Sequence, residues 1–237
     1  MNTSESKRNL RPLEIAIGIL CLIWTIWALF ITGLLIDSTD LWLSKYMELE
    51  GAFGSFFRTS MKVFTYLSYL INPLLLLWFI LMRKQLRKGT ATIAIIGLSV
   101  ATTLGIISTI INYVYPLTYD NLTNPRLVLI NVSAIIEHVS ILLVGIAYIL
   151  MNRQINKSLG SWAICIGVSM IVGIVFGLFS LFNSYVLIHL YPIQHFPTIS
   201  KAINITTEVV TVFKFFSLTV FYFLFARSER KTIWQKP

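Results

Sequence analysis

The sequence predicts an all-α fold: a polytopic membrane protein whose single domain, 1–237, is a bundle of six transmembrane helices with both termini cytoplasmic. Hydrophobic residues make up 56% of the chain and charged residues 12%, which is more apolar surface than a soluble domain can bury. The apolar residues also gather in long runs of about 20 residues or more, the length that crosses the hydrocarbon layer. Lys and Arg are concentrated in every second segment between these runs, and this asymmetry predicts the orientation of the helices in the membrane.

Each apolar run is predicted to be a helix, because lipid offers no other partner to the backbone polar groups. The first run is longer than the apolar core of a signal peptide, and no small-residue cleavage site follows it, so a retained helix is expected. The segment 37–60 mixes acidic and aromatic residues and is predicted to be an outer loop along the membrane interface. The predicted helices cover approximately 13–36, 61–82, 91–115, 127–151, 159–189 and 203–226.

The loops between the helices predict the orientation in the cell membrane. Lys and Arg are concentrated on one side, so the positive-inside rule makes that side cytoplasmic and gives it both termini. Basic residues at helix ends also account for the net charge of +9, so membrane lipids, and not nucleic acid, are the expected partners. The basic residues of the cytoplasmic side are Lys7, Arg8, Arg11, Arg83, Lys84, Arg87, Lys88, Arg153, Lys157, Arg227, Arg230, Lys231 and Lys236, and those of the outer side are Lys45, Arg58, Lys62, Arg126 and Lys201.

Small residues recur at intervals of four in the third and fifth predicted helices, where they would let helix backbones approach closely. Packing within the bundle is favoured over a dimer face, and no oligomeric state is predicted. The two cysteines, Cys21 and Cys165, lie in apolar runs and form no metal motif, so neither a metal nor a cofactor is expected. The small residues are Gly97, Ala101, Gly105 and Thr109 in the third helix, and Ser169, Gly173 and Gly177 in the fifth.

Ionisable residues inside the predicted helices are Glu137 and His138 in the fourth and Glu208 and Lys214 in the sixth. At 1.5 Å of rise per residue, Glu137 and Lys214 each lie roughly 15 Å from the outer end of their helix. An unpaired charge at that depth costs about 2.5–3.5 kcal/mol or more, so these two residues are predicted to pair. The alternatives are that Lys214 pairs with Glu208 or faces a water-filled cavity. In each case the charged residues brace the bundle interior.

Three short segments, taken in chain order, carry a resemblance to a known family. KVFTYLS at 62–68 opens the second helix, NVSAIIEH at 131–138 lies within the fourth, and Tyr191-Pro192 follows the fifth. Together they resemble the androgen-induced-gene (androgen-dependent TFPI-regulating) family of six-helix membrane proteins, including its bacterial members. The chain departs from the family pattern at Tyr69, where bacterial members often have asparagine, and after His138, where no proline follows within a few residues.

The resemblance implies a membrane hydrolase of fatty-acyl esters, because animal members of the family cleave fatty acid esters of hydroxy fatty acids with a threonine and a histidine. By matching motif, Thr65 would be the nucleophile and His138 the base that takes its proton. The alternatives are a non-enzymatic membrane protein, such as a small transporter, an immunity-type factor or a partner subunit, and a relative that keeps the fold without the chemistry. Convergence of Thr65 and His138 on one lipid-accessible cavity would favour the hydrolase, and a polar path across the membrane would favour transport.

The predicted depths of these two residues differ. A second helix that begins at Met61 puts Thr65 about 6 Å from the outer end, whereas His138 lies roughly 16 Å from it. The difference disappears if the second helix begins earlier, near Gly54, or if the helices are tilted.

Overall fold

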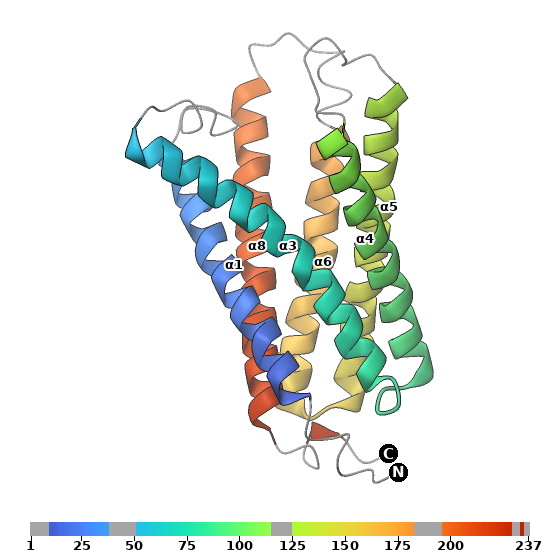
Figure 1. The fold of residues 1–237 in the computed structure, drawn as a ribbon. Coiled ribbons are helices and arrows are strands. Elements are labelled where there is room, and N and C mark those ends of the chain that lie inside the picture. The colour runs from blue at the N-terminus through green and yellow to red at the C-terminus, as the bar shows by residue number, and fades with distance from the viewer. Residues whose placement is uncertain (1–9, 38–50, 115–124, 183–195, 229–232, 235–237) are drawn as a thin grey trace.

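The fold is all-helical. The computed structural model describes residues 10–37, 51–114, 125–182, 196–228 and 233–234, and long helices account for nearly all of them (Figure 1). A short 3-10 turn, η2, lies at Asn152–Gln154. The long helices are α1 (Arg11–Asp37), α3 (Ala52–Met82), α4 (Lys88–Val114), α5 (Pro125–Met151), α6 (Lys157–Phe182) and α8 (Phe196–Arg227).

Five of these helices, α1, α4, α5, α6 and α8, are long and apolar enough to cross a membrane. In α3, the apolar stretch among the described residues is Leu70–Met82. Large hydrophobic side chains cover the outside of the bundle, as with Ile26 (61% exposed), Val175 (60%) and Phe213 (58%). An apolar exterior of this kind is suited to lipid and not to water, so the chain has the surface of a multi-pass membrane protein.

The six long helices form a closed ring. Going around it, α1 packs against α3, α3 against α4, α4 against α5, α5 against α6, α6 against α8, and α8 back against α1. The first residues of α1 and the last residues of α8 lie at the same end of the bundle, which we call the terminal end, and the opposite end is the far end (Figure 1). Figure 1 also shows α3 running obliquely across the bundle, from beside α1 at the far end toward α4 at the terminal end.

The second long helix begins at Ala52, earlier than the predicted residue 61, so residues 52–60 are helical and not part of an outer loop. Phe57 explains the difference, because its contact with α1 holds this segment against the neighbouring helix. Phe57 is fully buried and belongs to a cluster with Trp27, Ile31 and Leu35, and Phe64 stacks on Trp27 with ring centroids 4.2 Å apart. These contacts hold the far half of α3 against α1.

The other helix ends also differ from the predicted ones. The last helix begins at Phe196 and not at 203. The described part of the fifth ends at Phe182, so its predicted extension to 189 lies outside the described residues, as do 38–50 and the histidines His189 and His195.

Small residues bring α4, α5 and α6 into close contact, as packing within the bundle requires. A Cβ atom at Gly97 of α4 would overlap the backbone oxygen of Ser140 on α5. Gly145 of α5 and Gly167 of α6 face each other, and a Cβ atom added to either one would lie too close to the carbonyl oxygen of the other. Gly97 belongs to the small-residue stripe of the third predicted helix, so this part of the stripe packs inside the ring.

An aromatic cluster closes the terminal half of the ring. We call it the aromatic plug; its rings meet mainly edge to face, a favourable geometry for aromatic pairs. The hydroxyls of Tyr148 and Tyr222 are hydrogen-bonded at 2.7 Å, and the Nε1–H of Trp78 donates to Oε1 of the buried Glu14 at 3.3 Å. The plug consists of Trp78, Phe79, Tyr148, Phe221, Tyr222 and Phe225.

Below the plug, Gln154 connects the end of α5 to the start of α4. Its Oε1 accepts a hydrogen bond from the backbone N–H of Arg87 at 2.7 Å, and its Nε2–H donates to Oγ1 of Thr90 at 2.8 Å. The backbone N–H of Asn156 donates to the carbonyl oxygen of the buried Ile233 at 2.6 Å. Side-chain and backbone hydrogen bonds therefore fasten the loops of the terminal end to one another.

Candidate functional site

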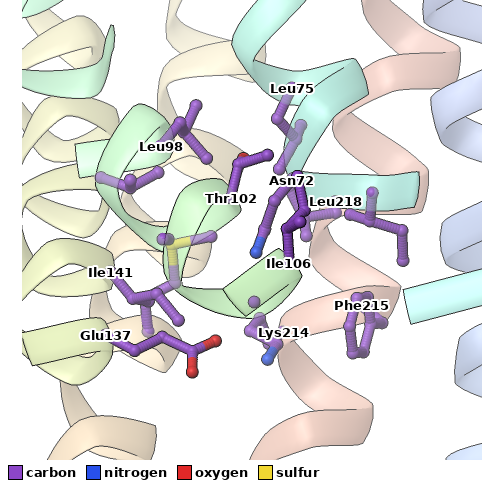
Figure 2. A pocket seen from close by; sticks show the side chains of 15 residues that line it. Asn72, Leu75, Leu98, Thr102, Ile106, Glu137, Ile141, Lys214, Phe215 and Leu218 are labelled. Atoms are coloured by element: carbon purple, nitrogen blue, oxygen red, sulfur yellow. The ribbon is translucent and has the colours of Figure 1, made fainter. Parts of the chain in front are cut away.

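Polar side chains from four helices meet at a cavity of about 290 Å³ inside the ring, which we call the central cavity. Asn72 comes from α3, Thr102 from α4, Glu137 from α5 and Lys214 from α8. Figure 2 shows these side chains extending into one space, with Glu137 and Lys214 reaching it from different helices. The rest of the lining is apolar and includes Leu75, Leu98, Ile141, Met170, Phe215 and Leu218.

The four polar residues lie at similar depths. Counted from the terminal end of each helix, Asn72 is about 15 Å away, and Thr102, Glu137 and Lys214 are about 20 Å away, at 1.5 Å of rise per residue. The aromatic plug lies between this level and the terminal end. The cavity therefore sits near mid-depth, closed on one side and bordered on the other by the far halves of the helices.

The oblique path of α3 accounts for the cavity. Its far half is held against α1 by the Trp27, Phe57 and Phe64 contacts, while toward the terminal end it packs beside α4. The two helices therefore diverge toward the far end (Figure 1). Ile71, Asn72 and Leu75 line the cavity from α3.

Glu137 and Lys214 line the same cavity without direct contact. Among the described residues, no nitrogen–oxygen pair within 4.0 Å joins Lys214 to a carboxylate. Its Nζ lies 4.5 Å from the ring centroid of Phe215, a cation–π distance. The two charges predicted to pair thus share a cavity, and the alternative of Lys214 facing a cavity describes its position better than a direct ion pair does.

Thr102 lines the central cavity, but its hydroxyl oxygen is covered and makes no hydrogen bond in the described part of the chain. Other hydroxyls in these helices bond to the carbonyl one turn earlier, as in Thr25 to Cys21, Thr32 to Ala28 and Thr219 to Phe215. The Oγ1 of Thr102 is buried and has no hydrogen-bond partner in the described part of the chain. Buried polar atoms are nearly always satisfied, so this oxygen is an exception at the wall of the cavity.

His138 belongs to a second cavity of about 190 Å³ between α5, α6 and α8, which we call the lateral cavity. Its Nδ1 lies 2.6 Å from the carbonyl oxygen of Ala134 and donates a hydrogen bond to it. The imidazole packs against Gly177 of α6, where a Cβ atom would overlap Nε2. The lateral cavity also contains Ser169, Thr207, Thr211 and Gly173, and shares Ile141, Met170 and Lys214 with the central cavity.

Thr65 lies in α3, and its side chain is outside those that the structure describes. Its backbone is about 20 Å along α3 from Ala52, and His138 is about 20 Å along α5 from Pro125. Because α3 runs obliquely (Figure 1), these equal lengths are not equal depths. The residues that line the lateral cavity with His138 come from α5, α6 and α8. The predicted approach of Thr65 to His138 stays a prediction.

Sequence reasoning anticipated Glu137, His138, Glu208 and Lys214 as interior polar groups but did not single out Thr102 or connect Gly177 with His138. A threonine in an apolar helix gives no signal of its own, because its usual bond to the preceding turn is not visible in the sequence.

Within the described ranges, no three His, Cys, Asp or Glu side chains gather as they would around a metal ion. Comparisons with protein-family models, curated proteins and solved structures find no match to the chain.

Proposed function

We propose that the chain is a six-span protein of the cell membrane, with both termini cytoplasmic, that binds a small solute in the central cavity. A protein of this kind is non-enzymatic and would be a small transporter or a binding subunit. The far end of the bundle is then the outer end, and the solute enters between the far halves of α3 and α4. The aromatic plug keeps the cavity closed toward the cytoplasm.

The observation that carries the proposal is the set of unused polar groups at one level of the bundle. Glu137 and Lys214 line the cavity without a direct ion pair, and the Thr102 hydroxyl lacks a partner in the described part of the chain. Ionisable groups at membrane depth are costly and usually mark a ligand or ion pathway. A mostly apolar cavity with a few convergent polar groups is also the usual form of a small-molecule site.

Labelling of an introduced cysteine tests this proposal. Thr102→Cys, made in a chain whose Cys21 and Cys165 are replaced by serine, is expected to react with a membrane-impermeant charged thiol reagent added to intact cells. The matched control is Ile107→Cys on the same helix, because Ile107 is nearer the far end and faces outward (45% exposed). The thiol of this control is expected to stay unlabelled in lipid. Equal labelling of both variants, or of neither, contradicts an aqueous cavity that opens outward.

A fatty-acyl ester hydrolase is the second candidate, and the position of His138 favours it. An imidazole whose Nδ1 is held at a carbonyl oxygen is oriented to use Nε2 as a general base. The Thr65 hydroxyl would attack the ester carbonyl while His138 accepts its proton; His138 then gives the proton to the departing alcohol, and water hydrolyses the acyl-threonine ester to release the fatty acid. Membrane lipids are then the source of the substrate.

A fluorophosphonate probe distinguishes this candidate from the first. A hydrolase is expected to be labelled in the wild-type form, to lose labelling in Thr65→Ala and His138→Ala, and to keep it in Thr211→Ala, a matched control in the lateral cavity. Labelling that is unchanged in Thr65→Ala removes Thr65 as the nucleophile. Loss in Thr211→Ala instead moves that role to the threonine that shares the lateral cavity with His138.

A further inference from the structure

The central cavity holds one carboxylate and one ammonium group that do not neutralise each other by direct contact. We propose that it binds a zwitterion with an apolar substituent, in which Glu137 holds the ligand's ammonium group and Lys214 holds its anionic oxygens. This inference rests on the proposed solute-binding function and names the chemical class of the solute.

The placement of the two charges favours a zwitterion over an ion. Glu137 extends from α5 and Lys214 from α8 into the same space (Figure 2). A ligand with a single charge would pair with one of them and leave the other desolvated, which is costly at this depth. A ligand that carries both charges pairs with both residues and brings no net charge into the membrane.

The neutral polar side chains of the cavity, those of Asn72 and Thr102, are also suited to the charged ends of a zwitterion. Asn72 and Thr102 line the cavity from α3 and α4, and the amide and hydroxyl can each donate to an anionic oxygen or accept from an ammonium group. The Thr102 oxygen is buried and unpartnered in the described structure, and a change of its χ1 rotamer would turn it toward a bound ligand.

The apolar lining sets the size and character of the rest of the ligand. Leu75, Leu98 and Ile141 are typical of the wall, which leaves about 290 Å³ of space. That volume is at the lower end of the range for ligand sites, about 300–1,000 Å³. It suits a free amino acid with a branched or aromatic side chain. The same pair of charges occurs in the headgroup of phosphatidylethanolamine, whose acyl chains would extend outward between α3 and α4.

Glu208 provides an internal control for the electrostatics. It lies on the same helix as Lys214, but it is absent from the lining of the central cavity. A variant at Glu208 therefore changes the field at Lys214 without removing a group that would touch the ligand.

Binding to the purified chain tests the inference. In nanodiscs of phosphatidylglycerol, radiolabelled leucine is expected to bind, and isovalerate and isopentylamine, which each lack one of its charges, are expected to bind at least about tenfold more weakly. Glu137→Gln and Lys214→Gln are expected to weaken leucine binding by at least about tenfold, and Glu208→Gln by less than about threefold. Thermal midpoints and elution volumes verify that the variants are folded, and the ligand comparison in the wild-type chain needs no variant.

Nanodiscs that contain phosphatidylethanolamine separate the two sources of the ligand. If the lipid is the natural ligand, native mass spectrometry finds phosphatidylethanolamine retained by the wild-type chain and lost from Glu137→Gln, while leucine competes poorly. Absence of both ligands, equal binding of isovalerate, or full binding by both cavity variants overturns the inference. Labelling of the Thr102→Cys variant from outside together with no zwitterion binding also overturns it, and in that case the aqueous cavity and the solute-binding function stand.

Discussion

The hydrogen bond between Tyr148 and Tyr222 allows a quantitative test of the aromatic plug. Both side chains are fully buried, and their hydroxyls are 2.7 Å apart. Replacing either tyrosine by phenylalanine leaves the other hydroxyl buried without its partner, which costs about 1–3 kcal/mol. Replacing both removes the pair but keeps the shape of the rings, so the double variant is expected to lie within about 1 kcal/mol of the wild type.

The expected result is strong non-additivity. The two single variants sum to about 2–6 kcal/mol of lost stability, so a nearly neutral double variant gives a coupling energy of about 1 kcal/mol or more. Reversible unfolding in lipid bicelles, followed by steric trapping, measures the free energy of unfolding for all four forms. If the double variant loses as much free energy of unfolding as the two single variants together, the tyrosines act independently. The hydrogen bond assigned between Tyr148 and Tyr222 would then be wrong.

Two further pairs of variants have unequal expected effects on stability. Gly177→Ala brings a Cβ atom into the His138 ring and is expected to cost about 1–3 kcal/mol, whereas Gly173→Ala, whose Cβ makes an ordinary 3.5 Å contact, should cost less than half as much; equal midpoints of thermal unfolding contradict this. Gln154→Leu removes the hydrogen bonds to the start of α4 and is expected to cost about 1–3 kcal/mol. Gln85→Leu removes a buried oxygen that has no partner in the described structure and should be neutral or stabilising; a larger loss at Gln85 than at Gln154 in the same assay refutes the assignment.

The sequence predicts the helices well where they are uniformly apolar. Lipid leaves the backbone no alternative to a helix, so α1, α4, α5, α6 and α8 follow from length and hydropathy. The start of α3 does not follow in this way, because Arg58 and Lys62 interrupt its apolar pattern and resemble loop residues. The contact of Phe57 with α1 stabilises that part of the helix, and a contact between distant segments is not visible in local composition.

The site is predictable from the sequence only in part. The depth of Glu137 and Lys214 follows from counting residues along each helix, so their presence at a common level was expected. Which way each side chain faces depends on how the helices are rotated in the ring. Adjacent residues differ by about 100° on a helix, and this rotation sends Glu137 to the central cavity and His138 to the lateral cavity. The free hydroxyl of Thr102 likewise depends on its local geometry.

The central claim is that α3 crosses the membrane, because only then do six spans surround the cavity and both termini share one side. The most direct test attaches a reporter of cytoplasmic or external location to each end of the full chain, in separate fusions, and measures both in intact cells. The N-terminal and C-terminal reporters are both expected to signal a cytoplasmic location. Termini on opposite sides would mean that only five helices cross, and the central cavity could not then form as described.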